Sequence, residues 1–452
     1  METVQNESRR NFLKFAGIGA SAAALSPSLI AAEFDSQSIQ TPYRVGEWLA
    51  SDKMFLAKWL DNQIQKAESS NEPLHPTVQE LKWLIEEDPQ IYMYFTQMFE
   101  QIPNTKTYAK TPMGTPQVRS YDQALKLISA VLRTAPEYNK TGLVGFPINA
   151  ILDWAMGTQA GAAVFLNEKV NAQFKKILNE WGRFLSSPDS TYVLSNDPKS
   201  GWFGADAQKA MPNFAKDFKC DPSLPYYGFK SWDDFFIREF KDGIRPVASP
   251  NDDSIIVNAC ESAPFKVARN VKKRDTFWIK SQPYSLEHML ANDKFTDKFV
   301  GGTIYQAFLS ALSYHRWHSP INGTVVKAYI KEGSYYAQAL SEGFDPASPN
   351  NSQAYITEVA TRAIMFIEAD NPKIGLICIM QVGMAEVSTC EITVKEGQKV
   401  KKGEQLGMFH FGGSTYCLML RPEVKVNFDL RGQKPSVNTY NIPVNSMLAK
   451  VY

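Results

Sequence analysis

Residues 406–420 read LGMFHFGGSTYCLML, and this stretch is the best guide to the fold of the C-terminal half of the chain. Apolar and aromatic residues on both sides predict two strands that meet at Gly412-Gly413. A glycine pair permits a tight turn without a Cβ clash and leaves the hydroxyl of Ser414 beside a backbone that can be strained. Taken alone, a Gly-Gly-Ser triplet is more typical of an ordinary turn than of a catalytic site.

The strand pattern extends over residues 231–452, where short apolar runs alternate with Gly, Pro and Asn. Four such runs lie at residues 254–258, 324–330, 363–368 and 374–382. Residues 40–187 instead carry apolar residues at helical spacing, with capping signals at Thr77–Glu80 and at Ser120–Gln123. Residues 188–230 are rich in Ser, Pro, Asp and Asn and predict a linker. We therefore expect an α+β protein with a helical N-terminal domain and a β-rich catalytic domain.

A weak internal repeat adds detail to the β-rich region. Residues 324–333 read TVVKAYIKEG and resemble EITVKEG at 391–397. The spacing is similar to the hammerhead strands of a biotinyl/lipoyl-type barrel-sandwich. A carrier domain would also present a modified lysine in a Met-Lys-Met-like hairpin, which this sequence lacks, so a carrier function is excluded.

Composition excludes several classes of protein. The 452 residues include 48 Lys+Arg and 47 Asp+Glu, so a net charge of +1 gives no overall field that would hold nucleic acid. Five cysteines without a Cys-x-x-Cys pair predict neither a zinc site nor a disulfide framework. No run of about 18 apolar residues suggests a membrane span.

The N-terminus resembles a targeting signal. Residues 8–14 read SRRNFLK, a mildly apolar Gly/Ala-rich stretch follows, and Ala31-Ala32 closes it. This pattern resembles a twin-arginine export signal, which predicts a signal peptide over 1–32 and a periplasmic location. A basic surface helix is the alternative. Export by this route implies folding, often with a cofactor in place, before transport.

Three segments contain residues suited to catalysis. Tyr314–Pro320 reads YHRWHSP and holds two of the five histidines, His315 and His318. Glu261 follows the apolar run 254–258, and Ser414 follows the glycine pair. A serine, a histidine and a carboxylate suggest a nucleophile, a base and an orienting acid, although each also has a structural interpretation. The absence of a Gly-x-Ser-x-Gly elbow disfavours an α/β-hydrolase.

In order along residues 231–430, these segments together resemble the phosphatidylserine decarboxylase family of pyruvoyl enzymes. The matching pieces are WDDFFIREF at 232–240, GIRP at 243–246, PYSL at 283–286, YHRWHSP at 314–320, VGM at 382–384 and the stretch 406–415. The resemblance implies self-cleavage between Gly413 and Ser414, with Ser414 converted into a pyruvoyl group. It also implies His318 as the base for Ser414, Glu261 as the acid that orients His318, and His315 as the residue that assists decarboxylation or protonation. Glu261 replaces the aspartate that most members carry.

The family chemistry implies a Schiff base between the pyruvoyl group and the substrate amine, with neither a metal nor pyridoxal phosphate. Residues 75–187, including EEDPQIYM at 86–93 and GLVGFPINAILDW at 142–154, are similar to the extra domain of the branch that contains the fungal L-tryptophan decarboxylase. We therefore expect a free, aromatic, tryptophan-like L-amino acid as substrate. Phosphatidylserine is the alternative substrate, and a non-catalytic binding homologue is the alternative function. The large and small chains left by cleavage are expected to stay together.

Overall fold

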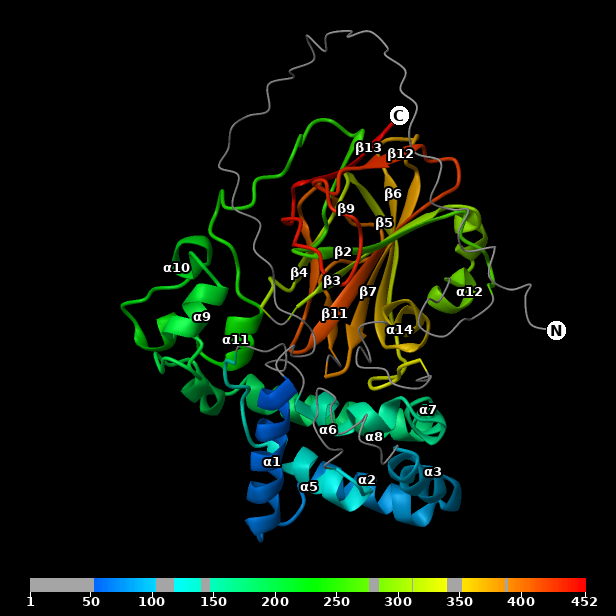
Figure 1. Ribbon diagram of the computed structural model, residues 1–452. Coiled ribbons are helices and arrows are strands. Elements are labelled where there is room, and N and C mark those ends of the chain that lie inside the picture. Colours follow the sequence, from blue (N-terminus) through cyan, green and yellow to red (C-terminus); the bar gives the residue numbers. More distant parts are fainter. Residues whose placement is uncertain are drawn as a thin grey trace, which may run out of the picture. The chain divides into compact units, whose positions relative to one another are not determined.

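The computed structural model describes residues 53–102, 118–139, 147–275, 284–310, 312–339, 352–386 and 389–452. The predicted signal peptide, residues 1–32, lies outside these ranges. Within the described part of the chain, helices come first and strands follow (Figure 1), which confirms the predicted α+β class. No helix among the described residues is long and apolar enough to cross a membrane.

Seven α-helices lie in the described N-terminal region: α1 (Lys53–Ser69), α2 (Pro76–Glu87), α3 (Pro89–Glu100), α5 (Tyr121–Val131), α6 (Pro147–Met156), α7 (Gln159–Phe165) and α8 (Glu168–Leu185). The predicted cap at Ser120 is confirmed, because its hydroxyl accepts a hydrogen bond from the Gln123 amide at 3.2 Å. The predicted cap at Thr77 is wrong. The N-cap is His75, two residues earlier, and the helix begins at Pro76, whose fixed φ suits the first helical position.

The segment that the sequence analysis treats as a linker, residues 188–230, contains η2 (Pro188–Val193), α9 (Ala205–Ala210), α10 (Phe214–Asp217) and η3 (Pro225–Gly228). It leads into α11 (Trp232–Phe236). Five of its aromatic side chains are buried in the main hydrophobic core: Trp202, Phe203, Phe214, Phe218 and Phe229. The segment is therefore packed against the core through its aromatic side chains, although most of its residues are polar. The domain boundaries themselves stay predictions.

The β-rich region is built on a seven-stranded antiparallel sheet. Its order is β2 (Ala263–Arg269), β3 (Thr303–Leu309), β11 (Gly413–Leu420), β7 (Leu376–Met384), β6 (Arg362–Ala369), β5 (Gly323–Lys331) and β9 (Lys399–Val400). The apolar runs predicted at 324–330, 363–368 and 374–382 correspond to β5, β6 and β7. Long apolar runs reveal these strands because both faces of the sheet are covered.

Two smaller sheets complete the described strands. One has the order β1 (Ile255–Val257), β13 (Met447–Val451) and β12 (Val426–Phe428); the other has β4 (Arg316–His318), β10 (Gln405–Phe409) and β8 (Cys390–Ile392). None of the described sheets closes into a barrel. The two halves of the internal repeat fall in β5 and in the segment from β8, so they contribute to different sheets.

Alternate residues of the central strand point into two different cores. Cys417 and Met419 of β11 lie in the core that also contains residues of α8, α12 (Leu286–Met289) and α14 (Gln353–Val359). Tyr416 and Leu418 lie in the core formed with the two smaller sheets. The helices and the smaller sheets thus cover opposite faces of the seven-stranded sheet.

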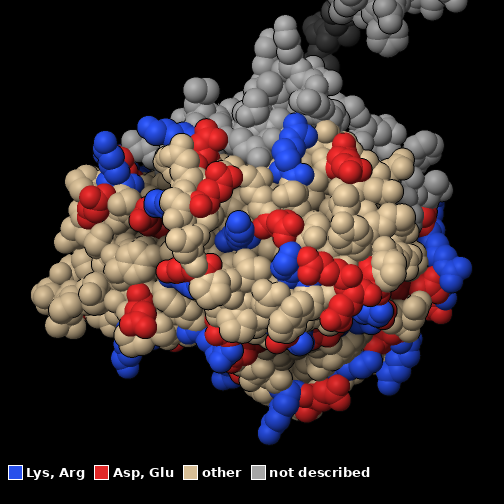
Figure 2. Space-filling view, turned by 90° about the horizontal axis from the view of Figure 1, so that it is seen from below, with Lys and Arg blue, Asp and Glu red and all other residues tan. Residues whose placement is uncertain are grey.

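On the face seen in Figure 2, acidic and basic side chains are interspersed and neither sign forms a continuous patch. Several of the charges are paired on the helices, as between Lys82 and Glu86 or Lys176 and Glu80. This distribution agrees with the balanced composition of the chain.

Candidate active site

Ser414 is the second residue of the central strand β11. It pairs with Leu309 of β3 on one side and with Gly383 of β7 on the other. Its side chain is fully buried, and its Oγ has no hydrogen-bond partner among the described residues. Gly412 just before the strand has φ = 133°, a conformation that favours glycine. A buried hydroxyl without a partner is unusual and fits an atom held ready for reaction.

His318 lies at the end of β4 and is hydrogen-bonded through both ring nitrogens. Nδ1 is 2.8 Å from the carbonyl oxygen of Gly403, and Nε2 is 2.9 Å from the Tyr314 hydroxyl. Because a carbonyl only accepts, Nδ1 carries the proton and Nε2 accepts from Tyr314. Burial lowers the pKa of His318 to about 4, against the opposing effect of the Gly403 carbonyl. The ring is therefore neutral at pH 7, and its lone pair is at Nε2.

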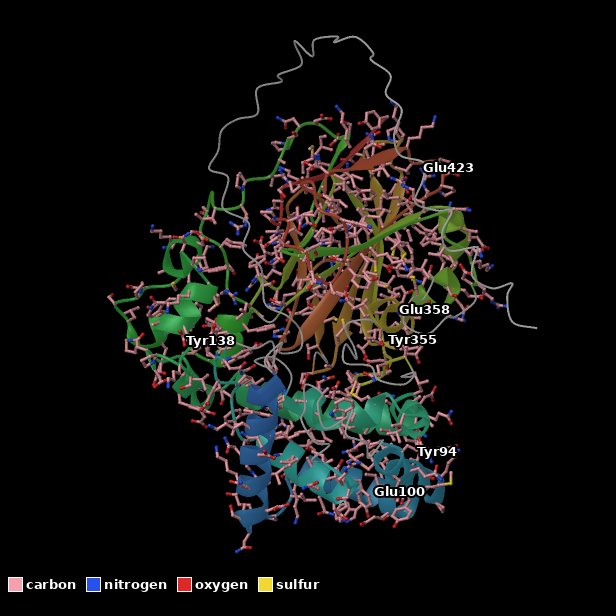
Figure 3. All side chains as sticks on the ribbon, in the orientation of Figure 1. Tyr94, Glu100, Tyr138, Tyr355, Glu358 and Glu423 are labelled. Carbon is pink, nitrogen blue, oxygen red and sulfur yellow. The ribbon has the colours of Figure 1, made fainter. Side chains whose placement is uncertain are left out.

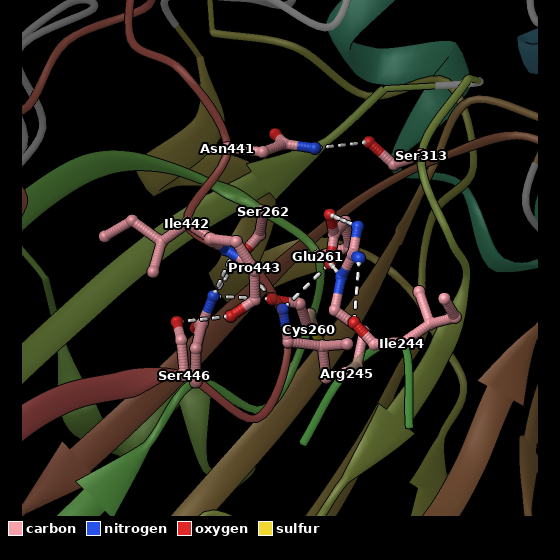
Figure 4. A network of polar contacts seen from close by, with 12 residues as sticks. Ile244, Arg245, Cys260, Glu261, Ser262, Ser313, Asn441, Ile442, Pro443 and Ser446 are labelled. Carbon is pink, nitrogen blue, oxygen red and sulfur yellow. Dashed lines mark hydrogen bonds and ion pairs between the residues drawn. The ribbon is translucent and has the colours of Figure 1, made fainter. Parts of the chain in front are cut away.

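Glu261 is paired with Arg245 in this structure (Figure 4). Its two carboxylate oxygens accept from Nη2 at 2.8 Å and from Nε at 3.1 Å, and Oε2 also accepts from the Val444 amide at 2.8 Å. The Glu261 side chain is 1% exposed and that of Arg245 is 7% exposed. This is a buried bidentate ion pair.

The expected contact between Glu261 and His318 is not found here, since both ring nitrogens of His318 are bonded to other groups. The two segments are nevertheless adjacent, because the His318 amide donates to the Ala259 carbonyl at 2.9 Å. In this structure the ring of His318 is oriented by Gly403 and Tyr314, while Glu261 anchors Arg245. Sequence reasoning identified Arg245 within the GIRP motif but gave it no role.

His315 is buried against the ring of Phe236, with centroids 3.9 Å apart and planes inclined by 20°. Neither ring nitrogen has a hydrogen-bond partner among the described residues. Burial lowers the pKa of His315 well below its usual range and Arg238 adds to this effect, whereas the backbone of Ser310 and Ser313 opposes it. The backbone carbonyl of His315 accepts from the Phe409 amide at 3.0 Å, which fixes the histidine segment to β10.

A cavity of about 430 Å³ lies between α8 and the residues just before the predicted cleavage point. Trp181 of α8, His410 and Phe411 line it, together with Asp233 and Glu386. His410 lies 2.9 Å from carboxylate oxygens of both Asp233 and Glu391. Burial alone would lower the pKa of His410, but these two acids raise it to about 9, so this histidine is a cation at pH 7.

Sequence reasoning missed Glu386. The signal that could have identified it is the one that identified Glu261, an acid placed directly after an apolar strand, here β7. Among the described residues, no group of three or more His, Cys, Asp or Glu side chains is arranged to hold a metal ion.

Comparison with known proteins gives these features a context. Residues 232–438 and, separately, residues 75–211 match families described as phosphatidylserine decarboxylase. The chain is 40% identical over 403 residues to L-tryptophan decarboxylase of Psilocybe cubensis, covering 84% of this chain and 88% of that protein. It is 42% identical to decarboxylase iboD of Amanita muscaria, covering 68% of this chain and 92% of that protein. Phosphatidylserine decarboxylase proenzyme 3 of Schizosaccharomyces pombe is 32% identical over 219 residues, covering 48% of this chain and 22% of that protein.

The match to the two fungal decarboxylases includes the helical region, whereas the match to the yeast proenzyme is limited to about half of the chain. These similarities also agree with the helical region followed by a β-rich region seen in the structure. The chain belongs to the phosphatidylserine decarboxylase family, in the branch of the fungal L-tryptophan decarboxylase, and is a decarboxylase.

Proposed function

We propose that this protein is a pyruvoyl-dependent decarboxylase of a free aromatic L-amino acid, matured by self-cleavage between Gly413 and Ser414. The observation that carries the proposal is the Ser414 hydroxyl, fully buried and without a partner among the described residues, at the start of the central strand. The two glycines before it leave the carbonyl under attack free of side-chain crowding.

Maturation would begin when Ser414 Oγ loses its proton to a base and attacks the Gly413 carbonyl carbon. The peptide C–N bond then breaks and an ester to Oγ forms in its place. Elimination of the Gly413 carboxylate leaves a dehydroalanine, and water converts this residue into a pyruvoyl group with release of ammonia. A neutral His318 suits the role of base, provided that Nε2 exchanges the Tyr314 hydroxyl for that of Ser414.

In the mature enzyme, the pyruvoyl ketone supplies an electron sink for loss of the substrate carboxylate as CO₂. The chain's own residues must then exclude water and return a proton to the substrate Cα. His315 suits this second task, because its ring is buried, neutral and unpartnered among the described residues. Phe236, stacked on one face of the ring, fixes its plane.

The substrate assignment is supported by the relatives whose similarity includes the helical region, of which one is named for L-tryptophan. The cavity lined by Trp181 and by Phe411, which is three residues before Ser414 in the chain, provides space for a flat side chain. We also propose export to the periplasm on the basis of the SRRNFLK motif. Fractionation of cells that produce the protein would test this, with the Arg9→Lys, Arg10→Lys variant retained in the cytoplasm.

The test of the main proposal combines intact-mass analysis with an assay of CO₂ release. Wild-type protein should give two chains, of which the smaller spans 414–452 and begins with the pyruvoyl group. Tryptophan, tyrosine, DOPA and phosphatidylserine vesicles are the substrates to compare. A single uncleaved chain would refute the proposal, and release of CO₂ from phosphatidylserine alone would refute the substrate class.

Variants separate the roles of the two histidines. Ser414→Ala and His318→Ala should stay uncleaved and inactive. His315→Ala should cleave normally but release CO₂ slowly. The same behaviour of both histidine variants would contradict this division of roles.

A further inference from the structure

Glu386 is a buried acid that no step of the proposed reaction uses. It lies two residues beyond the end of β7 and is 2% exposed. Its Oε1 accepts a hydrogen bond from the Asn149 amide of α6 at 2.8 Å, whereas Oε2 has no hydrogen-bond partner among the described residues. Burial raises the pKa of Glu386 to about 8, in opposition to the backbone amides of Asn149, Glu386 itself and Ile148, so the acid is largely protonated at pH 7 while no ligand is bound. An acid buried in this way is costly unless a ligand completes its bonding.

The cavity lined by Glu386 contains two aromatic side chains that could contact a flat ring. Trp181 and Phe411 line it and contact each other edge to face, with ring centroids 4.7 Å apart at 88°. The cavity volume of about 430 Å³ is within the range of small-molecule sites. The lining combines these rings with polar side chains, among them Asn179, Arg183 and Glu386. Aromatic walls with a few polar groups are typical of a pocket that fixes the orientation of its ligand.

The cavity is also at a suitable distance from the reacting residue. Ser414 pairs with Gly383 of β7, so Glu386 is three residues beyond the position opposite the reacting residue. At about 3.3 Å per residue, this separation is at most about 10 Å along the chain. Such a span is comparable with the length of an aromatic amino acid that is joined to residue 414 through its amine. Ala385 has φ = 54°, so the backbone turns through a strained conformation directly before Glu386.

The other charged groups in the cavity do not satisfy Glu386. Two basic side chains line the cavity. The ring nitrogens of His410 are engaged by Asp233 and Glu391, and Arg183 is paired with Glu180. No ion pair joins Glu386 to a basic side chain among the described residues. A neutral donor suits the free oxygen, because its binding stabilises the ionised acid and requires no second charge to be buried.

We propose that Glu386 accepts a hydrogen bond from the donor on the ring of the substrate, the N–H of an indole or the O–H of a phenol, and so selects aromatic amino acids that carry one. This inference rests on the proposed function and identifies a specificity residue for it. Selection of this kind is strong when the site's acceptor would otherwise be left unpaired.

The first test needs no variant. Wild-type enzyme is given tryptophan and 3-(benzothiophen-3-yl)alanine, in which sulfur replaces the ring N–H with little change of shape. We expect kcat/KM to favour tryptophan on the order of 10- to 100-fold. Tyrosine and phenylalanine form the equivalent pair for a phenol. Equal use of both members of each pair would overturn the inference.

The second test uses Glu386→Gln. Its amide oxygen can still accept from Asn149, but an NH₂ group replaces the free oxygen and faces the substrate donor. The preference for tryptophan over the benzothiophene analogue should fall to within about threefold, mainly through loss of tryptophan activity. Parallel loss of activity on both substrates would indicate a general structural role and overturn the inference.

Glu358→Gln is the matched control. Glu358 of α14, labelled in Figure 3, is also a buried acid whose Oε1 accepts from a backbone amide, that of Ser285 at 3.0 Å. Burial raises its pKa to about 8 as well, but it does not line the cavity. This variant should keep the wild-type preference, and its loss would count against the assignment to Glu386.

Intact mass distinguishes failure of this inference from failure of the proposed function. A wild-type chain that stays uncleaved and releases no CO₂ would refute the proposed function. A cleaved enzyme that is active on aromatic amino acids without discriminating the ring donor, or that prefers a basic amino acid, would overturn only the role of Glu386.

Discussion

Replacing Arg245 with methionine should strongly destabilise the fold, because it leaves Glu261 as a buried acid without its cation. Two N–H···O contacts of 2.8 and 3.1 Å join the two side chains, which are 7% and 1% exposed. Unit charges about 4 Å apart in an effective dielectric near 20 attract by about 4 kcal/mol. Removal of one partner of such a pair typically costs about 3–5 kcal/mol. The Val444 amide offsets part of this cost, since it continues to bond Glu261.

The assay is urea unfolding at equilibrium in a Ser414→Ala background, which keeps the chain in one piece. Arg245→Met and Glu261→Gln are measured singly and together. Each single variant should lower the free energy of unfolding by about 3–5 kcal/mol. The double variant should cost about 2–3 kcal/mol less than the sum of the two, since the partners are in direct contact.

Additive losses would refute the argument, because they would show that the two charges do not interact in solution. Cleavage of the same variants, measured with Ser414 restored, gives a second reading. If Glu261 acts mainly through Arg245, both single variants should slow maturation to a similar extent. Full cleavage of Arg245→Met with no cleavage of Glu261→Gln would instead favour a direct role of Glu261 at His318.

Two further predictions concern stability. The pKa of His410 is raised to about 9, against an ordinary value near 6.5. The protonated ring therefore stabilises the folded protein fully below pH 6.5, and this stabilisation is lost as the pH rises towards 9. Relative to His410→Gln, the uncleaved protein should therefore lose about 1–3 kcal/mol of unfolding free energy over this interval, and a difference independent of pH would contradict this. Gly407→Ala should cost more than about 3 kcal/mol in the same urea assay, because the new Cβ would lie 2.7 Å from the Trp317 ring. Gly182→Ala in α8 has open space around its Cβ and should stabilise by about 0.5–1 kcal/mol, so equal effects of the two would be inconsistent with the packing.

The sequence predicted the central strands well, since burial on both faces produces apolar runs that need no knowledge of the neighbouring strands. β6 and β7 are found within two residues of the expected positions. The packing of residues 188–230 was harder to predict, because composition weighs all residues equally. Trp202 and Phe229 are few among Ser, Pro and Asp, yet their rings are buried in the core.

Residue type and the family resemblance could single out the candidate site residues, but not their partners in the fold. Arg245 and Glu261 are 16 residues apart, and Asn149 and Glu386 are 237 residues apart. Such pairs depend on how the elements pack, which a single sequence does not reveal. The residue type identifies a possible acid or base, whereas its hydrogen bonds decide which task it can perform.

The position of β11 has a consequence for the mature enzyme. The small chain 414–452 would contain β12, β13 and nearly all of the central strand β11. Along its length, β11 is paired with β3 on one side and with β7 on the other. Release of the small chain would require both neighbouring strands to separate, so the nicked protein should remain assembled until it unfolds as a whole. Refolding of the cleaved protein from denaturant would then be a bimolecular reaction, because two separate chains must associate. Its rate should depend on protein concentration, whereas that of the uncleaved precursor should not.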